Sequence, residues 1–130
     1  MKLNYVKGTK DATSKHFYNK YDIEGFERRK ILMMVDSLCQ SMDKISEIRI
    51  SYPSDPDNRR ASITFDNCDD FLNDNVDLVE VDLIIVYGEH AEQYISAGIG
   101  LETRSMTISA GSMELEQNYF NDVSTKFKEL

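Results

Sequence analysis

Carboxylate and amide side chains crowd residues 66–77, and such oxygen ligands are the ones that Ca²⁺ binds in proteins. An EF-hand loop needs oxygen ligands at its positions 1, 3 and 5, glycine at position 6 and glutamate at position 12. A loop that begins at Asn73 has Leu78 at position 6, and one that begins at Asp66 has Phe71 there. Both registers fail, so we predict no metal site and interpret the segment as a solvated acidic loop. A looser site for a hard cation is the alternative.

A second group of titratable side chains is the tetrapeptide Glu-His-Ala-Glu at residues 89–92, which follows a predicted strand. Catalytic residues often lie at strand ends, but a polar turn has the same composition. Zinc would need clustered histidine and cysteine, and the two residues of each kind lie far apart in the sequence. No nucleophile-elbow, dinucleotide-binding or P-loop motif is present. We therefore predict a protein that is not an enzyme and that holds no cofactor.

Charge is distributed unevenly along the 130 residues, whose net charge is −8. Residues 1–30 have a net charge of +4, whereas residues 61–103 contain ten carboxylates and no lysine or arginine. Such a field attracts cationic partners and repels nucleic acid and anionic membranes. The expected partner is therefore a protein with a basic surface. The residues that we expect to face it are Asp66, Asp69, Asp70, Asp74, Asp77, Glu89 and Glu92.

These features favour a small, acidic, non-enzymatic protein-binding module that inhibits or escorts a larger protein. Immunity proteins, small phage-encoded inhibitors and secretion chaperones share this size and charge. The alternative is a homo-oligomeric structural or assembly protein, such as a homodimer in which the basic N-terminal segment of one subunit meets the acidic region of another. A third alternative, a small enzyme, is disfavoured because no acid–base pair is visible.

The composition is that of one globular domain, with 41% hydrophobic residues. The longest strongly apolar run, residues 83–87, is far shorter than the roughly 20 residues that span a bilayer. Two cysteines outside any C-x-x-C pair indicate free thiols rather than a disulfide framework. We therefore expect a cytoplasmic protein.

Helical periodicity predicts two helices. Apolar residues spaced by three to five positions predict the first helix from near Asp22 or Phe26 to Ile45. The second begins after Ser112 as N-cap and continues to the last residue. Its apolar stripe comprises Leu115, Tyr119, Val123, Phe127 and Leu130.

Alternation with a period of two predicts strands at residues 48–52, 61–65, 79–87, 95–101 and 106–110. The third of these is apolar on both faces at one end, which indicates a central strand with a second face that another element or subunit covers. In the fourth, Gly98 and Gly100 leave one face without side chains, so a helix or another backbone can approach closely.

The predicted fold is therefore α+β, a single domain in which a five-stranded, mainly antiparallel meander carries an N-terminal and a C-terminal helix. Residues 1–21 are predicted to be a basic, polar segment that forms an edge strand or a flexible tail, and residues 22–130 the domain itself.

Overall fold

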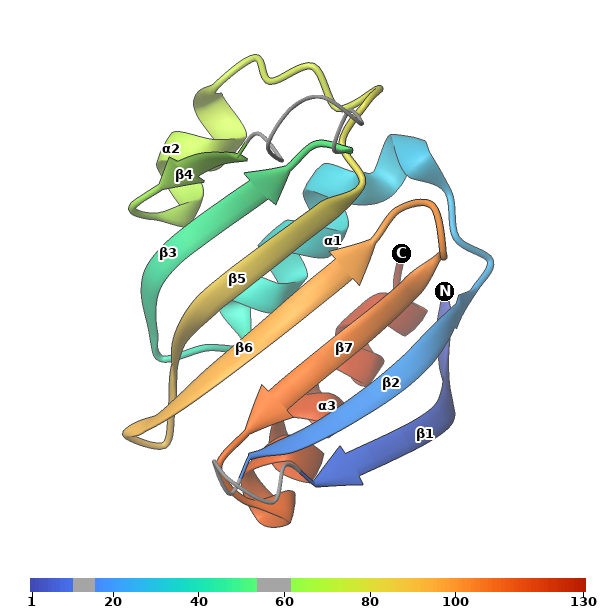
Figure 1. The fold of residues 1–130 in the computed structure, drawn as a ribbon, viewed down its shortest axis with the longest axis vertical. Helices are drawn as coiled ribbons and strands as arrows, with labels where there is room; N and C mark the ends of the chain where they lie inside the picture. The colour runs from blue at the N-terminus through green and yellow to red at the C-terminus, as the bar shows by residue number, and fades with distance from the viewer. Residues whose placement is uncertain (11–15, 54–61) are drawn as a thin grey trace.

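The structure, a computed structural model, describes residues 1–10, 16–53 and 62–130. These residues form one antiparallel sheet with the strand order β1-β2-β7-β6-β5-β3-β4 (Figure 1). The strands are β1 (Lys2–Lys10), β2 (Phe17–Glu24), β3 (Lys44–Ser51), β4 (Ser62–Phe65), β5 (Leu83–His90), β6 (Gln93–Gly100) and β7 (Ser105–Ala110). The helices are α1 (Ile31–Gln40), which follows the short 3₁₀ helix η1 (Arg28–Lys30), α2 (Cys68–Asn73) and α3 (Met113–Lys128).

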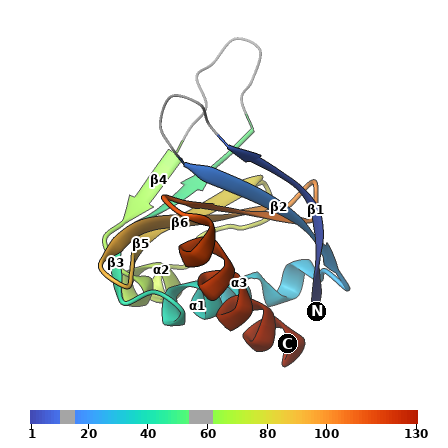
Figure 2. The same ribbon diagram turned by 90° about the horizontal axis from the view of Figure 1, so that it is seen from below.

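The described helices all lie on one face of the sheet, which leaves two layers (Figure 2). The core between the layers is made of aliphatic and aromatic side chains from both, among them Val35, Ile48, Ile99 and Val123, each fully buried. The prediction of an α+β class with an antiparallel sheet that carries helices is confirmed. The prediction of five strands is wrong, because the described residues contain seven.

The two additional strands come from the basic N-terminal segment. β1 is an edge strand paired with β2, and β2 pairs with β7 in the sheet, so β2 spans residue 22, where we predicted that a helix begins. That prediction is wrong because Tyr21 and Ile23 alternate onto the helix-covered face, where they are 1% and 4% exposed. Gly25 then ends the strand with φ +79°, a conformation that glycine adopts without strain.

The first helix is consequently shorter than predicted, and Ile45, its expected last apolar residue, lies in β3. The loop predicted at residues 66–77 contains α2, whose N-cap Asn67 accepts a hydrogen bond from the Asp70 backbone N–H at 2.8 Å. Residue 61, the first of the strand predicted at residues 61–65, lies outside the described residues.

The central strand β5 lies between β6 and β3 and presents apolar side chains on both faces, as predicted. Ile84 and Val86 are fully buried under the helices, whereas Leu83 and Ile85 lie on the opposite face. Alternation could not decide between two apolar faces. The strand also begins at Leu83 rather than at residue 79, because Val79 is 74% exposed and lies in the preceding loop.

Helix α3 has the predicted cap and buries four of the five predicted stripe residues. The fifth, Leu130, lies beyond the end of the helix and is partly buried. The Ser112 side chain accepts a hydrogen bond from the Leu115 N–H at 3.1 Å. Glu116, in the first turns, is fully buried and accepts hydrogen bonds from the Tyr21 hydroxyl at 2.8 Å and the Asn19 amide at 2.6 Å. These contacts bind α3 to β2, and burial followed by the Glu116 contact raises the pKa of Tyr21.

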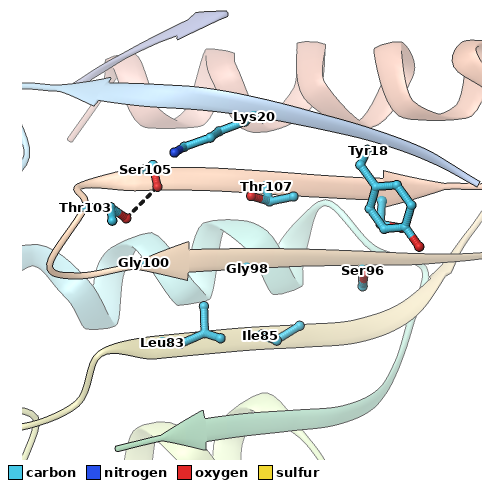
Figure 3. Close-up of a pocket in the computed structure, with 11 residues that line it drawn as sticks. Tyr18, Lys20, Leu83, Ile85, Ser96, Gly98, Gly100, Thr103, Ser105 and Thr107 are labelled. Carbon is cyan, nitrogen blue, oxygen red and sulfur yellow. Dashed lines mark hydrogen bonds between the residues drawn. The ribbon is translucent and has the colours of Figure 1, made fainter. Parts of the chain in front are cut away.

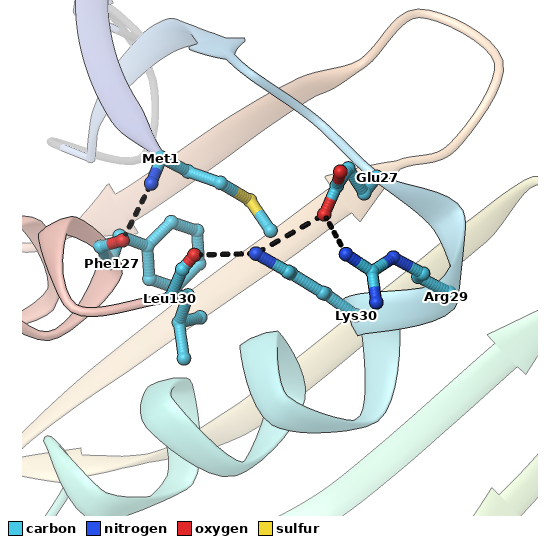
Figure 4. A network of polar contacts seen from close by, with 6 residues as sticks. All are labelled: Met1, Glu27, Arg29, Lys30, Phe127 and Leu130. Carbon is cyan, nitrogen blue, oxygen red and sulfur yellow. Dashed lines mark hydrogen bonds and ion pairs between the residues drawn. The ribbon is translucent and has the colours of Figure 1, made fainter.

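The far end of α3 is held by cationic groups (Figure 4). The Met1 ammonium donates to the Phe127 carbonyl oxygen at 2.9 Å, and Lys30 Nζ donates to the Leu130 carbonyl oxygen at 2.7 Å. Positive charge at a helix C-terminus is favourable because the last carbonyls are unpaired there. Lys30 also lies 3.1 Å from a Glu27 carboxylate oxygen and lowers the pKa of that carboxyl group.

Candidate functional site

The face of the sheet opposite the helices is not covered by any described element (Figures 1 and 2). We name it the open face. A cavity of about 400 Å³ lies on it, over the four strands β2, β7, β6 and β5. This cavity is the candidate site, because a hollow on the uncovered side of a central strand is where a ligand or partner has access to apolar surface.

Three rows of side chains, set by strand register, form the hollow. Each row runs across β5, β6, β7 and β2, with a smaller residue on each inner strand. Two rows have a large residue on both outer strands, and the third has Leu83 at one end and Asp22 at the other. The rows are Tyr87–Ser96–Ser109–Tyr18, Ile85–Gly98–Thr107–Lys20 and Leu83–Gly100–Ser105–Asp22. This arrangement creates a groove with β6 and β7 as its floor and β5 and β2 as its walls (Figure 3).

The dimensions of the groove follow from sheet geometry. Its walls stand three strand spacings apart, about 14 Å, and the three rows extend about 13 Å along the strands. The floor is low because Gly98 and Gly100 have no side chain there. Leu83 and Ile85 lie over Gly98, which is buried, and the Thr103 hydroxyl, 2.7 Å from the Ser105 hydroxyl, lies over Gly100.

The two walls differ in chemistry. The β5 wall is apolar, with Leu83 and Ile85 half-buried, and it continues into Tyr87. The Arg49 guanidinium lies 5.5 Å from the centre of the Tyr87 ring and is ion-paired to Glu47 at 2.9 Å, which fixes the outer side of this wall. The β2 wall is amphipathic, with the exposed Tyr18 beside Lys20.

Among the described residues that line the cavity, Lys20 alone carries a charge. The other polar side chains that line the cavity carry serine, threonine and tyrosine hydroxyls. Within the three described ranges, no group of three or more His, Cys, Asp or Glu side chains is placed to hold a metal ion. The cavity can therefore bind a ligand or a partner through complementary shape, apolar contacts and one ammonium group.

Five of the seven predicted acidic residues gather around α2, on the helix side of the sheet's β4 edge. Asp66 precedes this helix, Asp69 and Asp70 lie in its first turn, Asp74 is its C-cap residue and Asp77 follows in the next loop. All five are exposed. Asp70 and Asp77 are also structural, since Asp70 accepts from the Asn67 amide at 3.0 Å and Asp77 from the Val79 N–H at 3.0 Å.

The other two predicted residues, Glu89 and Glu92, lie at the opposite end of β5, in the hairpin that joins β5 to β6 (Figure 1). Helix α2 adjoins the β4 edge, and β3 and β4 lie between that edge and β5, so Figure 1 shows the two acidic groups at separate places. The seven residues therefore do not form one continuous patch.

His90, the histidine of the Glu-His-Ala-Glu tetrapeptide, stabilises the same hairpin. Its Nδ1 lies 3.0 Å from the Ser41 carbonyl oxygen, and its ring packs edge-on against Tyr119. The next residue, Ala91, donates its N–H to the Asp43 carboxylate at 2.7 Å. These contacts join the hairpin to the end of α1, so they account for the tetrapeptide as a structural turn.

Sequence reasoning missed most of the groove. The glycine pattern of β6 indicated a bare face, but the walls need the register of β5 and β2 against it. Tyr18 and Lys20 belong to the segment in which we placed no ordered core.

The described residues contain no helix long and apolar enough to cross a membrane. Comparisons with protein-family models, with curated proteins and with solved structures give no match.

Proposed function

We propose that this chain is a non-enzymatic protein-binding module that holds an α-helix of a partner protein in the groove of its open face. The observation that supports this proposal is the set of three rows across β5, β6, β7 and β2, in which the inner strands carry the smaller residues, two rows have large residues at both ends, and the third runs from Leu83 to Asp22. A single row could arise from packing requirements elsewhere. Three in succession make a trough with parallel walls, which matches an elongated partner.

The width of the groove favours a helix. The axes of the two wall strands lie about 14 Å apart, and the Cα atoms of an α-helix lie on a cylinder about 5 Å across, so the backbone of a helix can lie between the wall side chains. A floor of glycine and small hydroxyl residues lets the helix axis approach closely, and the apolar wall of Leu83 and Ile85 offers a surface for its apolar stripe. On the other wall, Lys20 favours an acidic side chain of the partner at that position.

The acidic residues act at longer range in this proposal. The net charge of −8 and the exposed carboxylates around α2 attract a partner with a basic surface, which speeds encounter without contact inside the groove. Binding would then occlude the partner's surface or escort the partner, and its rate would fall as salt rises.

The first experiment is a tagged pull-down from the native cell at low and high salt, read by native mass spectrometry. Three chains are compared: wild type, Thr107→Glu and Thr125→Glu. Both threonines are exposed and both variants gain one negative charge, but Thr107 lies on the groove floor and Thr125 on the outer side of α3. We expect wild type and Thr125→Glu to recover the same stoichiometric partner, and Thr107→Glu to lose it.

Glutamate at position 107 stands opposite Lys20 in the register, so the sheet tolerates the new charge and Tm should change little. A Thr107→Glu chain that folds normally and still binds the partner as wild type does would contradict the proposed site.

The proposed effect of the acidic residues on the association rate is tested separately with the triple variant Asp66→Asn, Asp69→Asn and Asp74→Asn. These carboxylates are exposed and, unlike Asp70 and Asp77, make no hydrogen bond within the described part of the chain. We expect association with the partner to slow by about tenfold at low salt, with little change in dissociation rate or Tm. An unchanged association rate would remove the acidic group from the binding mechanism.

Self-association is the second candidate, because Leu83 and Ile85 leave a central strand partly apolar on its uncovered face. Sedimentation velocity over a wide concentration range distinguishes it. A dimer that Thr107→Glu abolishes and Thr125→Glu preserves would assign the groove to a second copy of the chain.

A further inference from the structure

Two cysteines that are distant in the sequence meet between α1 and α2. The Cys68 thiol donates a weak hydrogen bond to the Asp36 carboxylate, with 3.8 Å between sulfur and oxygen. Cys39 lies three residues after Asp36 and so shares its side of α1. Cys68 is therefore placed beside Cys39, and both are free thiols in the reduced chain.

The two thiols differ in exposure. Cys39 is 8% exposed and belongs to the core, whereas Cys68, the first residue of α2, is partly accessible. Burial raises the pKa of Cys39, and the neighbouring Cys68 raises it further. Burial also raises the pKa of Cys68, but a hydrogen bond from Cys39 lowers it. Attack from outside should consequently begin at Cys68, with Cys39 held behind it.

We propose that Cys68 and Cys39 form a redox modification site that a small aliphatic disulfide converts into an intramolecular disulfide. The Cys68 thiolate attacks one sulfur of the reagent and displaces one thiolate, which leaves a mixed disulfide on Cys68. The Cys39 thiolate then attacks the Cys68 sulfur and displaces the second reagent thiol. The protein loses two protons and two electrons, and the reagent disulfide is reduced to two thiols.

The product would bind α2 covalently to α1 and close a loop of about 30 residues. Such a constraint is expected to raise Tm by roughly 10 °C for a chain of this size. It would also fix the position of Asp69 and Asp70, which lie in the first turn of α2. This inference does not depend on the function proposed for the groove.

The surroundings of Cys68 guide the choice of reagent. The Asp36 carboxylate contacts its sulfur, and the charges of Asp36 and Asp69 both raise the pKa of Cys68. A cationic disulfide is therefore favoured over an anionic one, and cystamine is the probe.

The experiment treats the reduced, full-length chain with excess cystamine at mildly alkaline pH and follows intact mass, free thiols and Tm. We expect wild type to end with no free thiol, no bound cysteamine and a mass lower by two hydrogens, with a raised Tm that a reductant restores. Cys39→Ser should stop with one cysteamine on Cys68, because no second thiol can displace it. Cys68→Ser should react at least about tenfold more slowly, because Cys39 is buried.

A wild-type chain that retains cysteamine, or that keeps both thiols free, overturns the proposal. If Cys39→Ser does not fold, Cys39→Ala gives the same test, since it also leaves Cys68 without a resolving thiol. A cysteamine adduct that forms on Cys39 before Cys68 in wild type would overturn the order of attack.

Discussion

The two faces of the sheet use the same strands for different purposes. On the helix-covered face, β5, β6 and β7 contribute fully buried aliphatic residues such as Ile84, Ile99 and Ile108. At an adjacent position on each strand, the open face carries Ile85, Gly98 and Thr107, of which Thr107 is exposed. Since successive side chains point to opposite faces, each face can be altered with little effect on the other. The covered face should therefore determine stability and the open face should determine binding.

The largest difference is expected between two adjacent isoleucines of β5. Ile84 is fully buried, so Ile84→Ala should lower the free energy of unfolding by about 4 kcal/mol through lost burial and the cavity that remains. Ile85→Ala, on the half-buried open face, should lower it by only about 1 kcal/mol. Urea unfolding monitored by circular dichroism gives both values.

The same pair separates the two roles. Ile85→Ala should weaken binding of the partner, because it removes part of the apolar wall. Ile84→Ala should bind the partner normally under conditions in which the variant is folded. Equal losses of stability at the two positions would show that the open face is covered in solution, and would point to self-association.

Two glycines, Gly88 and Gly98, allow a comparison of the space available beside the backbone. A Cβ at Gly88 would overlap the Lys44 carbonyl oxygen and lie 2.8 Å from Met42 Sδ, so Gly88→Ala should cost about 3 kcal/mol. A Cβ at Gly98 would lie 3.3 Å from Ile85 Cγ1, the nearest atom and one that can shift. Gly98→Ala should therefore leave stability within about 0.5 kcal/mol of wild type, because alanine also restricts the unfolded chain.

The measurement is again urea unfolding, with partner capture as the second readout. Gly98→Ala raises the groove floor by one methyl group, so it should reduce binding while leaving the fold intact. A severe loss of stability in Gly98→Ala would mean that the floor is already closely packed and that the groove is not open.

Elements with local signals could be predicted from the sequence. Helix α3 has its cap, its charge polarity and its stripe within 19 residues, and β6 and β7 alternate on either side of a short turn. The β1–β2 pair has no such local signal. Ile23, Phe26 and Ile31 match a helical spacing by coincidence. Tyr21 is covered largely by α3, almost 100 residues away, where it contacts Glu116 and stacks on Phe120.

The candidate site was predictable only in part, for the same reason. Gly98 and Gly100 marked the floor, but the groove exists because the strand register sets Leu83 and Ile85 on one side and Lys20 on the other. Register between non-adjacent segments is a property of the assembled sheet. Net charge indicated a basic partner and said nothing of the neutral surface that would contact it.

The smallest expected effect is a dependence of stability on alkaline pH that belongs to the covered face. Tyr119 is fully buried and donates its hydroxyl to the Leu38 carbonyl oxygen at 2.9 Å, and burial raises its pKa well above the ordinary value near 10. In the unfolded chain this tyrosine ionises near pH 10, whereas in the folded chain it stays protonated. Its contribution is thus complete below about pH 10 and is lost as pH rises above it, by up to about 1.4 kcal/mol per pH unit.

Tyr119→Phe isolates this contribution. The variant should be about 1 kcal/mol less stable than wild type at neutral pH, because the Leu38 carbonyl loses its donor. Above about pH 10 its stability should fall less steeply than that of wild type, so the two curves should converge. Urea unfolding between pH 8 and about pH 11 measures both slopes. Parallel curves would mean that the hydroxyl ionises in the folded chain, and the covered face would then be open to water at this point.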